Sequence, residues 1–137
     1  MKGVYVLVVS VAADVCVAVG ALGSVFFERG LYAYVGSGQV GLEKRVERHL
    51  RRAKKRFWHI DYLLGSEAAR VVDVFWRRGG RSEECRVAAV LCGKGAPVTG
   101  FGCSDCGCRS HLFKFCDCGF LKEFMHEFQL ELVGGAR

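Results

Sequence analysis

Apolar residues fill the first part of the chain and predict strands. Residues 4–11 are almost all apolar and mostly β-branched, which is typical of a strand buried on both faces. Shorter runs at 14–19, 25–28 and 31–35 predict further strands, because glycine-containing turns separate them. The pattern therefore indicates a meander of antiparallel strands over residues 4–35.

The hydrophobic period changes at Leu42 and predicts a helix. The stripe expected to face the core consists of Leu42, Val46, Leu50 and Ala53, which recur at helical spacing. Arg45 and His49 are four positions apart, so they project from a common second face of this helix.

The rest of the chain mixes helices and strands. A short helix is expected at 59–64, a strand at 69–76 and, after a turn at 77–80, a helix from an N-cap at Ser82 to about Cys92. Beyond it we expect a loop rich in glycine and cysteine at 100–110 and strands at 112–116 and 124–133. This order predicts one α+β domain over residues 1–137, with a small mixed or antiparallel sheet flanked by helices and a Cys-rich C-terminal extension at 100–137.

The first apolar stretch admits another interpretation. Residues 3–27 are almost wholly apolar, and a Met-Lys start before such a run resembles a signal peptide. A membrane-spanning helix needs about 20 uninterrupted apolar residues, whereas Asp14, Gly20 and Gly23 interrupt this stretch. Strands are therefore favoured, and we expect no membrane segment and a cytoplasmic protein. The rival is a secreted, disulfide-stapled protein whose mature chain lacks Tyr5.

Basic residues are in excess and cluster in one segment. The chain has 20 Lys and Arg against 14 Asp and Glu, a net charge of +6. Eight of the basic residues but only two of the acidic ones lie between Gly41 and Trp58, beside the aromatic pair Phe57-Trp58. A charge run is usually a solvated helix face, but an imbalance this large beside aromatic rings indicates that the segment contacts phosphate groups. We therefore expect a nucleic-acid partner.

Short motifs recur at informative distances along the chain. Two tyrosine triplets, Gly3-Val4-Tyr5 and Tyr34-Val35-Gly36, precede an arginine, Arg45, eleven residues after Tyr34, and a later helical glutamate, Glu84. Further motifs are Trp58-His59-Ile60-Asp61-Tyr62-Leu63-Leu64, Gly100-Phe101-Gly102-Cys103-Ser104-Asp105-Cys106 and Ser110-His111-Leu112-Phe113. In these residues the whole chain resembles the GIY-YIG nuclease superfamily, and within it the uncharacterised prokaryotic branch of Uri-type endonucleases. The 28 residues between Tyr5 and Tyr34 exceed the interval in the plainest members, so residues 14–28 are interpreted as an inserted hairpin.

The resemblance implies an endonuclease that hydrolyses phosphodiester bonds with one divalent metal. Glu84 would supply the hard oxygen ligand for Mg²⁺ or Mn²⁺, with its neighbour Glu83 as the competing choice. Arg45 would bind a non-bridging phosphate oxygen, because its guanidinium is planar and permanently charged. Tyr5 or Tyr34 would act as the general base, a choice that stays open. The two tyrosines, Arg45 and Glu84 should converge on one concave basic surface.

The remaining candidates would contact the leaving group or the nucleic-acid backbone. His49 and His59 would position or protonate the leaving group, because histidine titrates near neutrality; a structural role or a contact with a phosphate remains the alternative for both. The residues expected to contact the backbone are Ser37, Lys44, Arg48, Arg52 and Lys55.

Five of the eight cysteines fall in one C-terminal segment. They are Cys103, Cys106, Cys108, Cys116 and Cys118, with His111 among them. This density is compatible with a Zn²⁺ site or with disulfides, yet only Cys103 and Cys106 have the spacing of a zinc knuckle. Buried thiols are a further alternative, and the cysteines within apolar runs are expected in the core: Cys16, Cys85 and Cys92.

The function that we expect is that of an endonuclease selective for the shape or strandedness of its substrate, because backbone-directed groups outnumber groups suited to base edges. DNA is favoured over RNA as the partner. The alternative is a non-catalytic, zinc-containing nucleic-acid-binding module. A homodimer or a partner protein is compatible with either function.

Overall fold

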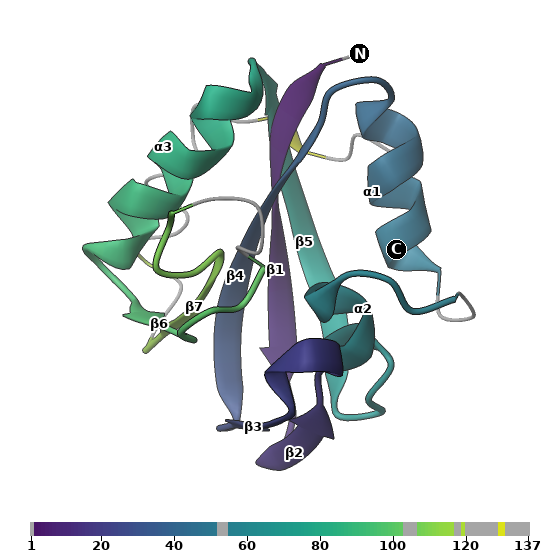
Figure 1. The fold of residues 1–137 in the computed structure, drawn as a ribbon, viewed down its shortest axis with the longest axis vertical. Coiled ribbons are helices and arrows are strands. Elements are labelled where there is room, and N and C mark those ends of the chain that lie inside the picture. Colours follow the sequence, from purple (N-terminus) through teal and green to yellow (C-terminus); the bar gives the residue numbers. More distant parts are fainter. Residues whose placement is uncertain (1, 52–54, 103–106, 117–118, 120–128, 131–137) are drawn as a thin grey trace.

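A six-stranded antiparallel sheet forms the centre of the molecule (Figure 1). The structure, a computed structural model, describes residues 2–51, 55–102, 107–116, 119 and 129–130. In spatial order the strands are β6 (Ala96–Pro97), β7 (Leu112–Phe115), β4 (Gly30–Gly38), β1 (Gly3–Val11), β5 (Ala69–Arg78) and β8 (Gln129–Leu130). The expected α+β class with an antiparallel sheet is confirmed.

Helices cover both faces of this sheet. Helices α1 (Leu42–Leu50) and α2 (His59–Leu64) lie on one face, and α3 (Arg81–Cys92) lies on the other (Figure 1). Because side chains alternate along a strand, Tyr5 and Leu7 of β1 pack under α1 and α2, whereas Val4 and Val6 pack under α3. This alternation between two cores explains why β1 reads as a continuous apolar run.

The predicted hairpin is present, but it is not part of the central sheet. Strands β2 (Val15–Ala18) and β3 (Ser24–Phe27) form their own two-stranded sheet, joined through the 3₁₀ turn η1 (Gly20–Leu22). The expected continuous meander is therefore wrong. The physical reason is that β1 pairs with β4 along one edge and with β5 along the other, so no edge of β1 is left for β2.

Helix ends differ from the predictions in two places. Helix α3 begins at Arg81 with Gly80 as its N-cap, and no side-chain hydrogen bond caps it, so the predicted N-cap at Ser82 is wrong. On α1 the buried residues are Leu42, Val46 and His49. His49 thus occupies a core position of the helix, and Leu50 is half-buried.

Strand ends also shift. The strands β4 and β5 run on to Gly38 and Arg78, and the two-residue strand β6 was not predicted. Ala53 lies outside the described residues, and so does most of the strand expected at 124–133. The described part of that strand is β8. Within the described ranges, no helix is long and apolar enough to cross a membrane.

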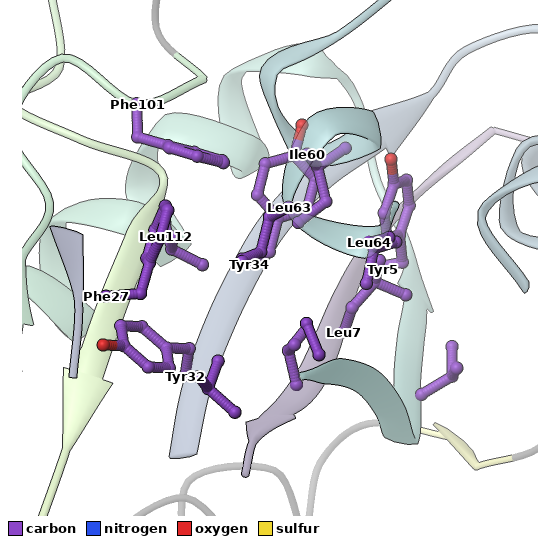
Figure 2. Packing of buried hydrophobic residues seen from close by; sticks show 14 of the residues in the cluster. Tyr5, Leu7, Phe27, Tyr32, Tyr34, Ile60, Leu63, Leu64, Phe101 and Leu112 are labelled. Atoms are coloured by element: carbon purple, nitrogen blue, oxygen red, sulfur yellow. The ribbon is translucent and has the colours of Figure 1, made fainter. Parts of the chain in front are cut away.

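Aromatic side chains form much of the core under α2. Figure 2 shows Tyr5 and Tyr34 on neighbouring strands, pointing to the side of the sheet where Ile60 and Leu63 of α2 lie. Phe101, which precedes β7 in the sequence, closes this core and is fully buried. The two tyrosines of the short motifs are therefore core residues whose hydroxyl ends approach one end of the sheet.

Candidate active site

An open cavity of about 600 Å³ lies at the end of the sheet where β4 leads into α1. Residues from four elements line it, among them Tyr5, Tyr34, Arg45 and Glu84. Lys44 adds a second basic side chain to its wall. The expected convergence of the four residues on one concave surface is confirmed.

Glycines of the tyrosine motifs make room for close packing at this end of the sheet. Gly36 lies directly opposite Tyr5 in the β1–β4 pair, and a Cβ at Gly36 would overlap the hydroxyl of Tyr5. A Cβ at Gly3 would lie 2.6 Å from Leu42 Cδ2 and 2.7 Å from the carbonyl oxygen of Arg77. Both positions therefore require glycine for reasons of space, because any side chain would displace a neighbour.

Tyr5 is joined to α1 by a buried hydrogen bond. Its hydroxyl lies 2.6 Å from His49 Nε2, and both residues are almost fully buried. Burial raises the pKa of Tyr5 well above the usual 10.0, Tyr34 raises it further, and the Arg45 guanidinium offsets only part of this rise. The hydroxyl of Tyr5 is therefore protonated at neutral pH.

Tyr34 lies within an aromatic group beside Tyr5. Its ring centroid is 6.4 Å from that of Tyr5, 6.1 Å from that of His49 and 6.2 Å from that of Phe101. Burial, and then the nearby Glu84 carboxylate, raise the pKa of Tyr34 far above its usual value. Like Tyr5, it presents a protonated hydroxyl to the cavity.

Arg45 is held by contacts on two sides. Its Nη1 donates a hydrogen bond of 2.7 Å to the carbonyl oxygen of Ser37. Its Cζ lies 4.5 Å from the centroid of the Trp58 ring, a cation–π distance. A guanidinium has five N–H donors, so these contacts orient Arg45 and leave donors for an anion in the cavity.

Glu84 reaches the cavity from the opposite face of the sheet. Strand β7 pairs with β4 only at residues 31–34, so its pairing stops before the last part of β4. Ser37 faces the same side of the sheet as Val35, which packs under α3. The Ser37 hydroxyl donates a hydrogen bond of 2.6 Å to Glu84 Oε1. The cavity therefore combines the tyrosines of one face with the carboxylate of the other.

The chemistry of Glu84 suits a hard divalent cation. Although burial by itself raises the pKa of Glu84, hydrogen bonds from His111 and Ser37 lower it below the usual range. Each carboxylate oxygen accepts from one of these residues and has further lone pairs. One carboxylate is enough for Mg²⁺ or Mn²⁺, because Mg²⁺ usually keeps several of its waters. The donor set therefore fits such an ion.

The neighbouring carboxylate, Glu83, has a different environment. Its Oε2 lies 2.7 Å from Arg77 Nη2, and its Oε1 lies 2.8 Å from Arg86 Nη1. Of the two glutamates, Glu84 lines the cavity. The geometry thus favours Glu84 over Glu83 as the candidate metal ligand, a choice that the residue types alone left open.

Arg48 has a structural partner. It forms two hydrogen bonds of 2.9 Å with the buried carboxylate of Asp61 and a third of 2.7 Å with the carbonyl oxygen of Lys55. Its Cζ also lies 4.5 Å from the Trp58 ring centroid. These contacts fix the segment before α2, and a contact of Arg48 with nucleic acid stays a prediction.

The other residues expected to contact nucleic acid lie in different places. Ser37 and Lys44 line the cavity. Lys55 is exposed, and Arg52 lies outside the described residues.

His59 supports the cavity from behind. Its Nδ1 accepts a hydrogen bond of 2.8 Å from the backbone N–H of Gly102, and its ring centroid is 5.6 Å from that of Phe101. Burial lowers the pKa of His59, which agrees with an unprotonated acceptor. His59 does not line the cavity, so the geometry favours the structural alternative for this residue.

Four side chains of the cavity wall were not predicted as site residues from the sequence: Gln39, Val40, Trp58 and Arg81. Gln39 Nε2 is buried and has no hydrogen-bond partner within the described part of the chain. Arg81 precedes Glu84 by one turn of α3, and this spacing was the available signal. Gln39 follows the second tyrosine motif in a loop, where no periodicity marks it.

Three soft or borderline ligands lie together behind Glu84. The ligand atoms of Cys85, Cys108 and His111 are all within 4.8 Å of one another and can hold a metal ion. Cys85 is only half-buried, so its interpretation as a core thiol is wrong, and the same holds for the exposed Cys16. Cys92 packs against the core under α3, as expected.

The remaining expected zinc ligands do not join this group in the described structure. Cys116 is exposed, and Cys103, Cys106 and Cys118 lie outside the described residues. No disulfide joins the cysteines that the structure describes, which are Cys16, Cys85, Cys92, Cys108 and Cys116.

Of the comparisons with known proteins, one names a family. No curated protein and no solved structure matches the chain. A family model described as "Domain of unknown function DUF123" matches residues 4–133. Since this match covers almost the whole sequence, the chain belongs to the DUF123 family, a GIY-YIG-like family.

Proposed function

We propose that this protein is a metal-dependent endonuclease that hydrolyses phosphodiester bonds in nucleic acid. The observation that carries the proposal is the convergence of Tyr5, Tyr34, Arg45 and Glu84 on one open, largely basic cavity. Arg45 and Lys44 supply positive charge at its wall, and a phosphodiester is an anion that such a wall attracts. Cleavage needs a positioned water and charge stabilisation at the phosphate.

Glu84 is the residue that would hold Mg²⁺ or Mn²⁺. A bound divalent cation would stabilise negative charge on the phosphate and lower the pKa of a water. Ser37 and His111 hold the Glu84 carboxylate deprotonated and fixed in direction. Arg45, oriented by Trp58 and the Ser37 carbonyl, would bind a non-bridging phosphate oxygen through its remaining N–H donors.

The tyrosines act as protonated hydroxyls in this proposal. Because burial raises the pKa of Tyr5, a lone tyrosinate base is unfavourable. The hydrogen bond to His49 offers a relay: Tyr5 Oη accepts a proton from the attacking water while its own proton passes to His49 Nε2. Tyr34, whose pKa is also raised, would donate a hydrogen bond to the phosphate.

The substrate class follows from the groups at the cavity. The wall offers cations, hydroxyls and the amide of Gln39, whose Nε2 has no hydrogen-bond partner among the described residues. All of these groups are suited to a sugar-phosphate backbone. We therefore propose selection by strandedness or shape, with DNA as the first substrate to test. A cytoplasmic location and action as a homodimer or with a partner protein remain expectations from the sequence.

The test is a cleavage assay with Mg²⁺ on single-stranded, duplex, flap and junction DNA. Glu84→Gln and Arg45→Lys should each lower the cleavage rate by about 10²–10³-fold, which is the usual effect of removing one group that stabilises charge in the transition state. The matched controls are Glu83→Gln, because Glu83 pairs with arginines away from the cavity, and Arg70→Lys on the exposed side of β5. Both controls should stay within about twofold of the wild type.

Two outcomes would contradict the proposal. Full activity of Glu84→Gln would remove the metal ligand from the mechanism. Nucleic-acid binding by the wild type without cleavage of any substrate would favour the alternative, a non-catalytic binding module.

A further inference from the structure

Behind the cavity, two cysteines and a histidine from distant parts of the chain approach each other. Cys85 is on α3, directly after Glu84, whereas Cys108 and His111 lie in the segment before β7. Their ligand atoms are all within 4.8 Å of one another. Tetrahedral zinc sites have metal–sulfur distances of about 2.3 Å and metal–nitrogen distances of about 2.0–2.1 Å. In a tetrahedron with these distances, the ligand atoms are about 3.5–4 Å from one another. A small inward movement of the three side chains is therefore sufficient.

The protonation of His111 agrees with a role as a ligand. Its Nδ1 lies 2.9 Å from Glu84 Oε2 and 3.2 Å from the carbonyl oxygen of Val35. A deprotonated carboxylate and a carbonyl both accept hydrogen bonds, so Nδ1 carries the proton. In the neutral ring Nε2 then has the lone pair, which is the form that binds a metal. His111 is 1% exposed, so its ring orientation is fixed by the core.

The ligand types select the metal. Two thiolates and an imidazole favour Zn²⁺, whereas the hard ions Mg²⁺ and Mn²⁺ prefer oxygen. We infer that Cys85, Cys108 and His111 form a zinc site that is separate from the proposed Mg²⁺ ligand Glu84. Both cysteines bind as thiolates, so each releases its proton when Zn²⁺ binds.

The site would have two structural effects. It ties α3 to the segment before β7, where the regular elements are short: β6 has two residues and β7 has four. It also fixes His111, whose other nitrogen holds Glu84, in a carboxylate–histidine–metal arrangement. His111 is therefore a positioning residue for Glu84. Only this second effect rests on the proposed function, because zinc binding can be measured without any substrate.

The experiment measures zinc in the full-length protein. The wild type, purified without chelators, should hold about one Zn²⁺ per chain by mass spectrometry of the metal. Loss of a residue that hydrogen-bonds to a metal ligand weakens metal binding roughly 10–100-fold. Cys85→Ser and Cys108→Ser each remove a ligand itself, so each should weaken zinc binding by more than this. Cys92→Ser on the same helix and Cys116→Ser are the matched controls and should keep the wild-type zinc content.

Replacement of Zn²⁺ by Co²⁺ gives a second readout, which reports directly on the sulfur ligands of the metal. A thiolate-to-cobalt charge-transfer band should appear in the wild type and in Cys92→Ser. Cys85→Ser should show a weaker band, because one thiolate is lost. Glu84→Gln should weaken zinc binding about tenfold but not abolish it, because it removes the carboxylate partner of His111.

Three results would overturn the inference. The first is a wild-type protein that binds no Zn²⁺ in direct titration. The second is unchanged zinc content in both Cys85→Ser and Cys108→Ser, which would place the ion on other cysteines. The third is a thiol titration that finds Cys85 and Cys108 joined as a disulfide in the purified protein. None of these results depends on nuclease activity, so zinc binding and the proposed function can fail separately.

Discussion

The glycine opposite Tyr5 provides the sharpest test of how the tyrosine motifs build the cavity. In Gly36→Ala the new Cβ would overlap the Tyr5 hydroxyl and lie 2.9 Å from Tyr5 Cε2. Carbon atoms in favourable contact are about 3.5–4.0 Å apart, so the ring of Tyr5 must move by at least roughly 0.6 Å. Gly36 does not have a positive φ. The substitution therefore adds steric overlap without backbone strain.

The size of the effect follows from the burial of Tyr5, which is 1% exposed. Overpacking of a buried site costs about 1–3 kcal/mol, less than the total stability of about 5–15 kcal/mol that is usual for such a domain. Gly36→Ala should therefore stay folded at room temperature with that loss of unfolding free energy. Because the ring shift lengthens the hydrogen bond of 2.6 Å to His49, the proposed cleavage rate should fall by roughly 10²-fold.

The assay is urea unfolding followed by tryptophan fluorescence, with Gly107→Ala as the matched control. Among the described residues, a Cβ at the exposed Gly107 meets no atom within 4 Å, so this variant should unfold like the wild type. A double-mutant cycle with Tyr5→Leu then isolates the part of the unfolding free energy that the overlap with the Tyr5 ring costs. If Gly36→Ala costs as much in the Tyr5→Leu background as in the wild type, the overlap with Tyr5 is not its cause, and the reasoning fails.

Two further predictions concern Asp61 and Phe57. The pKa of Asp61 is lowered, because hydrogen bonds from Arg48 and from the backbone of Trp58 and Phe57 outweigh the opposing effect of burial. Since the folded pKa lies below the unfolded value, this carboxylate stabilises the fold above the unfolded pKa and loses that effect as pH falls through the folded pKa. Asp61→Asn should therefore cost roughly 2–4 kcal/mol at pH 7, and this cost should shrink as the pH falls below the unfolded pKa and through the lowered folded pKa; a cost that does not change with pH in urea unfolding would contradict this. Phe57 is 74% exposed beside Trp58, so Phe57→Ala should leave stability unchanged and weaken single-stranded DNA binding by about 1–3 kcal/mol through lost base stacking. Unchanged affinity in fluorescence titration would exclude Phe57 from the binding surface.

Much of the fold was predictable because it depends on local patterns. The apolar run of β1, the helical period from Leu42 and the short helix at 59–64 each follow from spacing along the chain. The errors arose where a competing partner decided the outcome. Among the described strands, β2 and β3 of the hairpin pair with each other and not with the central sheet, because β4 and β5 already occupy both edges of β1. Likewise α3 begins without the expected serine cap, directly after the turn that ends β5.

The candidate site was predictable only in part. The tyrosines, Arg45 and Glu84 were identified through a family resemblance, and the structure adds the contacts that orient them. His59 was grouped with the leaving-group residues, yet it holds the loop at Gly102. A histidine in a motif gives no sign of whether its ring faces a cavity or a backbone N–H.

The sequence by itself determined the class of elements, the excess of positive charge and the residue types suited to phosphate chemistry, because these depend on composition and on spacing within one element. Only the tertiary structure decided which side chains meet. Glu84 accepts a hydrogen bond from Ser37, whereas Glu83 pairs with Arg77. Arg48 forms an ion pair with Asp61, and Cys85 lies beside Cys108 and His111. The physical reason is that most of these contacts join segments far apart in sequence. Their geometry depends on how α1 and α3 pack on opposite faces of the sheet and on where β7 stops pairing with β4.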